Sequence, residues 1–226
     1  MDHTGALGLL LKETPNAQIL STKTASLFLK NILHRDVKGK AVEDGESFSL
    51  GNKQLKFIHA PYWHWPDTMF TYVEEDRVLF PCDGFATHFC DERLFDDRVD
   101  DFTEDFRYYF EHIMGPYRKK ILEAIEKIKG LDIRIIAPSH GPILRTDPWK
   151  YINAYKDWST PVRNPNKKLI LVFYASMYGN TKKMAEAVAK GASTINTDVK
   201  LFDAAGVSPE FVRCEIESAD GILFGS

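Results

Sequence analysis

The sequence has few cysteines and no long apolar run. Only Cys82, Cys90 and Cys214 occur among its 226 residues, and none belongs to a Cys-x-x-Cys pair. This set argues against a disulfide framework and against iron or zinc held by thiolates, and it fits a reducing cytoplasm. A membrane-spanning helix needs about 18 consecutive apolar residues. No such run exists, so we expect no membrane partner.

An excess of charge of one sign is also lacking. The 29 Lys and Arg residues nearly balance the 32 Asp and Glu residues, which gives a net charge of −3. Nucleic-acid-binding domains are usually strongly basic, so we expect no nucleic-acid partner. The apolar residues 6–11 follow no basic segment and precede no small-residue cleavage site. We therefore expect no secretory signal and a cytoplasmic location.

Residues 1–160 mix short strands with amphipathic helices. Helices are expected at 5–13, from Ser21 or Thr22 to 33, at 104–114, from there to 129 after a break at Gly115-Pro116, and at 148–160. Strands are expected at 18–20, 47–50, 54–60, 69–73, 78–81 and 134–137. Polar composition predicts loops at 38–46 and 91–101.

The composition changes after the segment PVRNPNKK at 161–168, which is prolyl, basic and nearly free of large apolar side chains. In the strand expected at 168–175, the run LILVFYA after Lys168 is continuously apolar, as in strands buried on both faces of a parallel sheet. A helix at 181–192, a strand at 199–203, a helix at 208–218 and a strand at 221–225 follow. This βαβαβ order predicts a parallel sheet, and such a sheet normally needs further elements to cover both of its faces.

The loop between the apolar strand and the next helix is a candidate anion site. Small and hydroxyl residues here lead into a helix N-terminus, where backbone N–H groups and the helix dipole favour a phosphate. Ser176, Asn180 and Thr181 can add side-chain hydrogen bonds. The loop lacks the Gly-Lys-Ser/Thr ending of a P-loop and is not Gly-x-Gly-x-x-Gly. An ordinary strand-to-helix turn with a hydroxyl cap remains an alternative.

A second set of chemically capable residues lies in the first part of the chain. Asp2, His3, His64, Asp83 and His140 are candidate metal ligands, and most of them stand in turns that follow apolar segments. Imidazole and carboxylate donors suit iron, zinc or manganese, and an Asp among histidines can bridge two ions. Taken singly, a histidine between tryptophans is more often a packing residue than a ligand, and an Asp before a Gly can be a simple turn residue.

Both sets resemble parts of known families. Ser176, Met177, Tyr178, Gly179, Asn180 and Thr181 match the flavodoxin phosphate loop position by position, which implies FMN. The segments HWPD at 64–67, FPCDGFATH at 80–88 and APSHGP at 137–142 resemble the metallo-β-lactamase-like domain of flavodiiron proteins. In that family this domain precedes a flavodoxin-like one, so the resemblance covers essentially the whole chain.

The resemblance implies an α/β fold, namely a partial metallo-β-lactamase-like αβ/βα sandwich followed by the first half of a flavodoxin-like doubly wound parallel sheet. The expected divisions are a diiron domain at 1–160, a linker at 161–168 and an FMN-binding domain at 169–226. In the family the ligands are His-x-Glu-x-Asp-His, a further His, a bridging Asp and a final His. Asp2 and His3 match the end of the first motif, His64 the next ligand, Asp83 the bridge and His140 the last.

The His-x-Glu half of that motif would precede residue 1. We therefore expect a piece of a longer protein whose domains are both incomplete. One iron would keep Asp2, Asp83, His140 and His3, and the other only His64 and the bridge. Exposed sheet edges in such a piece also predict poor solubility.

The resemblance to flavodiiron proteins further implies an oxidoreductase that reduces O2 to water, NO to N2O, or both. Electrons would pass from a donor such as rubredoxin or a flavin reductase through FMN to two non-haem irons, in a head-to-tail homodimer. His88 would be a donor beside the ligands, or simply an exposed turn residue. Two alternatives stay open: an FMN electron carrier with a vestigial metal domain, and a zinc hydrolase of the metallo-β-lactamase type.

Overall fold

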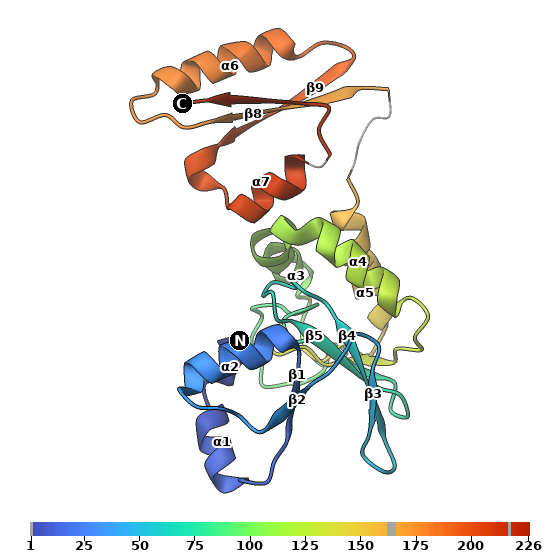
Figure 1. The fold of residues 1–226 in the computed structure, drawn as a ribbon. Helices are drawn as coiled ribbons and strands as arrows, with labels where there is room; N and C mark the ends of the chain where they lie inside the picture. The colour runs from blue at the N-terminus through green and yellow to red at the C-terminus, as the bar shows by residue number, and fades with distance from the viewer. Residues whose placement is uncertain (1, 162–165, 217) are drawn as a thin grey trace. The chain divides into compact units, whose positions relative to one another are not determined.

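The computed structural model describes residues 2–161, 166–216 and 218–226 (Figure 1). Half of the predicted linker, residues 162–165, therefore lies outside the described residues. The chain divides into two compact units, Met1–Ser159 and Thr160–Ser226.

The first unit is built on a five-stranded sheet in the order β3-β4-β5-β6-β7. These strands are β3 (Ser47–Ser49), β4 (Gln54–His59), β5 (Met69–Val73), β6 (Val78–Phe80) and β7 (Ile135–Ile136). Neighbours are antiparallel except β6 and β7, which run parallel. Alternate residues of β5 point to opposite faces. Phe70 and Tyr72 are therefore buried on the core side while their neighbours are only half-buried.

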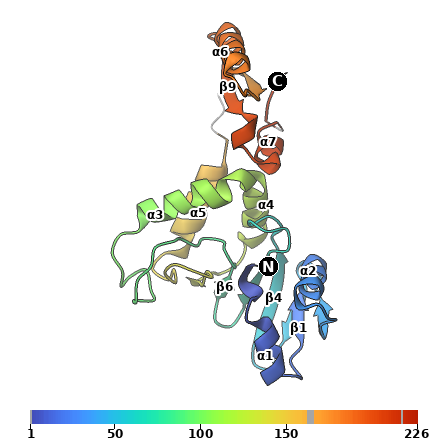
Figure 2. The same cartoon turned by 90° about the vertical axis from the view of Figure 1, so that its left-hand side faces the viewer.

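Helices cover one face of this sheet, with α4 and α5 side by side (Figures 1 and 2). They are α3 (Thr103–Tyr109), the π-helical turn η2 (Phe110–Met114), the 3-10 turn η3 (Gly115–Tyr117), α4 (Arg118–Ile128) and α5 (Pro148–Ser159). The buried residues of α4 are Ile121, Ala124, Ile125 and Ile128, a helical spacing of three and four. The predicted break at Gly115-Pro116 is confirmed, because the turns η2 and η3 interrupt the α-helical geometry and separate α3 from α4. Proline is tolerated at the start of η3, where its missing N–H is not needed.

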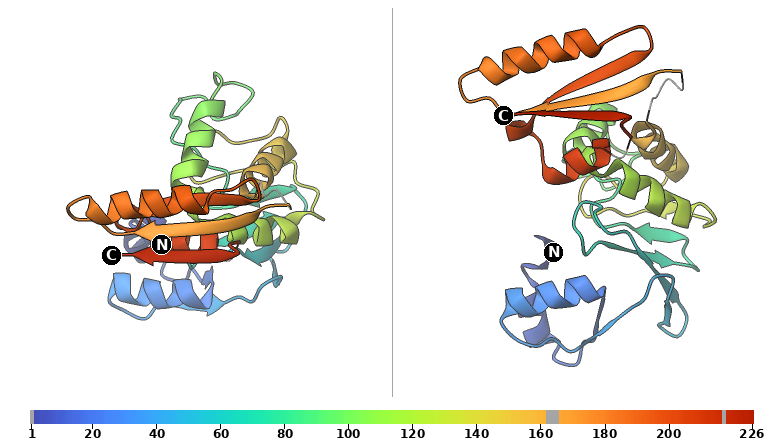
Figure 3. Two further views of the ribbon diagram at one scale, coloured as in Figure 1. Left: turned by 90° about the horizontal axis from the view of Figure 1, so that it is seen from above. Right: turned by 45° about the horizontal axis from the view of Figure 1, so that its top comes forward.

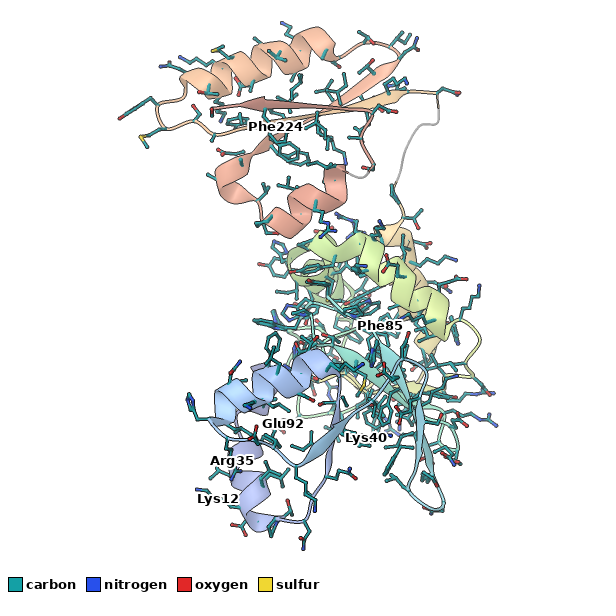
Figure 4. All side chains as sticks on the ribbon, in the orientation of Figure 1. Lys12, Arg35, Lys40, Phe85, Glu92 and Phe224 are labelled. Atoms are coloured by element: carbon teal, nitrogen blue, oxygen red, sulfur yellow. The ribbon has the colours of Figure 1, made fainter. Side chains whose placement is uncertain are left out.

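An aromatic core joins sheet and helices. Trp63, Phe70, Phe85, Phe110 and Tyr155 are almost fully buried, and Phe85 lies between sheet and helices in Figure 4. The Tyr155 ring centroid is 4.8 Å from that of Phe85, 4.9 Å from that of Phe110 and 5.9 Å from that of Trp63. Rings this close contribute about 0.5–1.5 kcal/mol per pair beyond the area they bury. The cluster therefore anchors the loop that carries His64.

The N-terminal segment forms a separate layer. It consists of η1 (Asp2–Thr4), α1 (Leu7–Glu13), β1 (Ile19–Ser21), α2 (Lys23–Leu33) and β2 (Gly39–Ala41). The hydroxyl of Thr22 caps α2 by accepting a hydrogen bond from the backbone N–H of Ala25 at 3.0 Å. The loop predicted at 38–46 is wrong in part, because 39–41 pairs in parallel with β1. Residues 39–41 are held as a strand by pairing with β1, and they carry no local apolar pattern from which a strand could be predicted.

The second unit is a parallel sheet in the order β10-β8-β9. Its elements are β8 (Lys168–Tyr174), α6 (Asn180–Ala192), β9 (Thr197–Asp203), the 3-10 turn η4 (Ala204–Gly206), α7 (Pro209–Ile216) and β10 (Gly221–Gly225). On β8, Leu171 and Phe173 pack toward α7, and Val172 and Tyr174 pack toward α6. Figures 1 and 3 show the two helices on opposite faces of the sheet. Both faces of β8 are thus covered, as its apolar sequence predicts.

Candidate metal centre and anion-binding loop

Asp83 stands at the end of β6, in a turn that its neighbours hold in an unusual conformation. Cys82 and Phe85 have positive φ angles of 55° and 60°. Gly84 lies against Trp63, because a Cβ at residue 84 would fall 2.7 Å from the Trp63 Cε3 atom. The carboxylate of Asp83 is only 2% exposed. The turn therefore presents a rigid, almost fully buried carboxylate.

Three histidines surround this carboxylate, and they divide between its two oxygens. The Nε2 atoms of His3 and His140 lie 3.1 and 3.4 Å from Oδ1, whereas Nε2 of His64 lies 3.2 Å from Oδ2. Oδ1 itself makes no well-aligned hydrogen bond within the described part of the chain. Imidazole nitrogens on both sides of one buried carboxylate are the donor arrangement that a bridged pair of cations requires.

Packing positions His64. The preceding Trp63 is fully buried and donates its indole N–H to the carbonyl oxygen of Lys120 at 3.0 Å. On the other side, the Thr68 hydroxyl lies 3.0 and 2.9 Å from the carbonyl oxygens of Trp63 and Trp65. The imidazole therefore extends from a loop that is held at both ends.

His140 is oriented by a backbone carbonyl. Its Nδ1 atom lies 3.3 Å from the carbonyl oxygen of Thr87, which leaves Nε2 to face Asp83. This is the outer support that metal-ligating histidines usually have. Gly141 has a φ of 83°, and a Cβ there would meet the Thr87 side chain at 2.6 Å. The close approach of the 138–142 turn to Thr87 thus requires glycine.

The histidines control the charge of Asp83. Burial by itself would raise the pKa of this carboxyl group, but the adjacent side chains of His140 and His64 and the charge of His3 lower it well below its usual range. Asp83 is therefore ionised at neutral pH and is able to bind a cation.

The structure also brings together residues that the sequence patterns did not connect. The Cys82 sulfur, a ring nitrogen of His3 and a carboxylate oxygen of Asp83 lie within 4.8 Å of one another. Burial raises the pKa of the Cys82 thiol, and the charge of Asp83 raises it further. The position of Cys82 directly before the predicted ligand Asp83 could have indicated that its sulfur lies at this site. The sequence patterns discounted it because no cysteine belongs to a Cys-x-x-Cys pair.

Of the other predicted residues, Asp2 lies with His3 in η1, and its side chain is outside the described part of the structure. His88 is exposed. Its ring stacks on that of His140 with centroids 5.6 Å apart, and it meets Tyr109 edge-on at 4.9 Å. Buried Tyr109 in turn contacts the His140 ring at 5.4 Å. His88 therefore adjoins a candidate ligand from the solvent side.

A cleft of about 470 Å³ opens beside these rings. It is lined by residues of the 87–94 segment and the 140–142 turn, including His88, Cys90, Arg93 and His140. A smaller cavity of about 160 Å³ approaches Asp83 from elsewhere and is lined by Thr22, Trp65, Asp67, Cys82 and Asp83, among others. The buried carboxylate thus lines a cavity.

The predicted anion-binding loop joins β8 to α6. Gly179 precedes the helix with a φ of 82°, and no atom lies within 4 Å of the position that a Cβ would take. The Ser176 hydroxyl oxygen is buried and has no hydrogen-bond partner among the described residues. Met177 and Tyr178 are each 87% exposed. An unsatisfied hydroxyl beside the free N–H groups of a 13-residue helix fits a bound phosphate.

No helix within the described residues is both long enough and apolar enough to cross a bilayer.

Two family models divide the chain as the structure does. The model described as ODP family beta lactamase matches residues 2–141, and the flavodoxin model matches residues 172–226. The fold and the sites thus define an α/β protein in which a metallo-β-lactamase-like domain is followed by the start of a flavodoxin-like domain.

Relatives make the assignment specific. The type A flavoprotein fprA of Rhodobacter capsulatus is 40% identical, covering 100% of this chain and 53% of its own length. The anaerobic nitric oxide reductase flavorubredoxin of Vibrio vulnificus is 36% identical, covering 100% of this chain and 47% of its own. The structure of rubredoxin oxygen:oxidoreductase from Desulfovibrio gigas matches with a TM-score of 0.67 at 27% identity, covering 100% of this chain and 57% of that one.

The chain belongs to the flavodiiron protein family. It spans about half the length of the curated relatives it matches.

Proposed function

We propose that the protein to which this chain belongs is an oxidoreductase that reduces O2 to water, NO to N2O, or both, at a non-haem diiron site supplied with electrons through FMN. The observation that carries this proposal is the division of three imidazoles between the two oxygens of buried Asp83. The relatives support it, since one is named a nitric oxide reductase and another an oxygen oxidoreductase.

In this proposal Asp83 would be a ligand shared by both irons. His3 and His140, together with Asp2, would serve the iron at Oδ1, and His64 the iron at Oδ2. The donor set suits iron because it combines neutral imidazoles with an ionised carboxylate. Iron would supply one-electron chemistry and the polarisation of oxygen atoms, while the protein holds the ligands in place through Trp63 and Thr87.

The phosphate of FMN would bind at the loop Ser176, Met177, Tyr178, Gly179, Asn180 and Thr181. The unsatisfied Ser176 hydroxyl and the N-terminus of α6 support this assignment. The corresponding domains would be residues 1–160 for iron and 169–226 for FMN, joined by the linker 161–168.

His88 would act from the cleft side. Its ring lies against His140 and Tyr109, so it is positioned to hold a proton close to the metal site without being a ligand. If it does so, replacing His88 with Gln would change the pH profile of turnover more than it changes iron content.

A rubredoxin-type electron donor is the proposed partner, because rubredoxin appears in the names of two relatives. A head-to-tail homodimer that brings the FMN of one subunit to the iron site of the other is also proposed, together with a cytoplasmic location in keeping with the three cysteines.

Metal analysis combined with a visible spectrum tests the function. Two irons and one FMN per chain in the intact protein, with O2 or NO consumed on addition of reduced rubredoxin, are the expected result. Flavin without iron would instead favour an electron carrier. One observation favours the electron-carrier alternative, because His64 is the one described histidine that lies at Asp83 Oδ2. Zinc without flavin would favour a hydrolase.

A further inference from the structure

Asp83 has a second kind of donor beside it, the thiol of Cys82. We propose that Cys82 is a further ligand of the cation held by His3 and Asp83, so that this divalent cation is bound through nitrogen, sulfur and oxygen together, with Co²⁺ as the probe used to test it. This inference rests on the metal-binding part of the proposed function. It adds a sulfur ligand to a set otherwise made of histidine and aspartate.

The spacing of the donors carries the proposal. Ligands of one tetrahedral ion lie about 2.0–2.3 Å from the metal, and so roughly 3.3–3.8 Å from each other. The three donor atoms lie within 4.8 Å of one another, and His3 Nε2 is 3.1 Å from Asp83 Oδ1. Small side-chain adjustments are therefore enough to bring all three onto one cation.

The buried carboxylate is an independent sign of a cation. Asp83 is 2% exposed, and its Oδ1 atom has no well-aligned hydrogen bond among the described residues. An ionised oxygen in such a place is costly unless polar or positive groups offset its burial. The imidazoles of His3 and His140, at 3.1 and 3.4 Å from Oδ1, supply part of that offset, and the proposed cation would supply the rest.

The backbone holds Cys82 in place for this role. Residue 82 has a φ of 55°, and its carbonyl oxygen accepts a hydrogen bond from the N–H of Ser139 at 2.8 Å. The residue is half-buried and lines the 160 Å³ cavity together with Asp83, which provides an entry path. Cys90, in contrast, is exposed and lines the other cleft.

Binding would involve no redox change. The cation forms a bond to sulfur, and the thiol proton leaves to solvent, as occurs when metals bind cysteine. The reaction therefore needs only the metal and a buffer to accept the proton.

The test is a Co²⁺ titration of the metal-free 226-residue chain without oxygen. We expect a sulfur-to-cobalt charge-transfer band in the near ultraviolet that saturates with bound cobalt. Cys82→Ser should remove the band and weaken cobalt binding by about 10-fold or more. The matched control Cys90→Ser should keep both. Cobalt bound without the band, a band that survives in Cys82→Ser, or no binding at all would overturn the proposal.

Alkylation of the chain without any substitution gives a measurement that does not depend on whether a variant folds correctly. Bound Co²⁺ should slow the alkylation of Cys82, followed by mass spectrometry, and leave Cys90 unaffected. Equal rates with and without cobalt at Cys82 would refute the sulfur ligand. The proposed function is judged separately, because a Cys82→Ser protein that still binds iron and FMN leaves it standing.

Discussion

The Nε2 atom of His64 lies 3.2 Å from Asp83 Oδ2, on the opposite carboxylate oxygen from the one that faces His3 and His140. Imidazole groups thus approach this one carboxylate from both of its oxygens. The consequences for metal binding, for the supporting turns and for the flavin loop can each be tested.

Replacing Asp83 with Asn should abolish iron binding at both positions together. The amide keeps the shape of the side chain but removes the charge and one acceptor, and so the donor shared by both positions is lost. We expect at least a 100-fold loss of iron affinity, measured by equilibrium dialysis with metal analysis. Asp91→Asn is the control, since Asp91 pairs with Arg93 on the surface. Loss of only one of the two irons would contradict the bridging role.

Gly84→Ala should destabilise the first domain and displace His64. The added Cβ would stand 2.7 Å from the buried ring of Trp63, whose backbone leads directly to His64. Overpacking of this kind costs about 1–3 kcal/mol. Urea unfolding would measure the cost, and metal affinity the displacement. In the matched control Gly130→Ala, no atom lies within 4 Å of the new Cβ, so stability should stay within about 1 kcal/mol of the original. Equal effects of the two changes would show that the contact with Trp63 is unimportant.

Ser176→Ala should weaken flavin binding without lowering the stability of the flavin-free chain. The Ser176 hydroxyl has no partner among the described residues, so removing it costs no internal hydrogen bond. If it binds phosphate, its loss should weaken FMN binding by about 1.5–3 kcal/mol, or roughly 10- to 100-fold, because hydrogen bonds to charged groups are strong. Fluorescence titration with FMN and thermal unfolding of the flavin-free chain provide the two readings. Exposed Ser193, beyond the far end of α6, serves as the control for replacement by Ala. An unchanged FMN affinity would remove Ser176 from the site.

Acid should weaken the attachment of the 42–46 loop to α4. Asp44 accepts hydrogen bonds from the His59 N–H and the Lys127 ammonium group, both at 2.8 Å. Burial by itself raises the pKa of Asp44, but these hydrogen bonds from Lys127 and His59 bring it below its ordinary value of 3.8. The unfolded chain therefore binds this proton more readily than the folded one.

The stabilisation from Asp44 is thus complete above about pH 4 and is lost as the pH falls through the lowered pKa. The side chain is 45% exposed, so we expect no more than about 1 kcal/mol. Urea unfolding of Asp44→Asn and the original chain from pH 6 to pH 2.5 would measure it. The difference in stability should shrink as the pH falls, and a constant difference would rule out the linkage.

Local sequence patterns predicted those elements that interactions between neighbouring residues stabilise. The apolar run of β8 and the turns that follow it predicted a parallel sheet, and Thr22 capped its helix as expected. The resemblance also named His3, His64 and His140 as candidate ligands with Asp83, and the structure brings the three imidazoles to this carboxylate. One prediction, the loop at 38–46, failed in part for a non-local reason, because strand β2 depends on its pairing with β1.

The sequence by itself determined the family, the order of the two domains and the identity of the candidate ligands, because these are properties of residue types at short spacings. Only the tertiary structure decided which oxygen of Asp83 each histidine faces, and that Cys82 stands among them. Residues 3, 64, 83 and 140 are far apart in the chain. Their meeting depends on how the aromatic core and the Gly84 turn fold the strand ends together, and no local spacing encodes that.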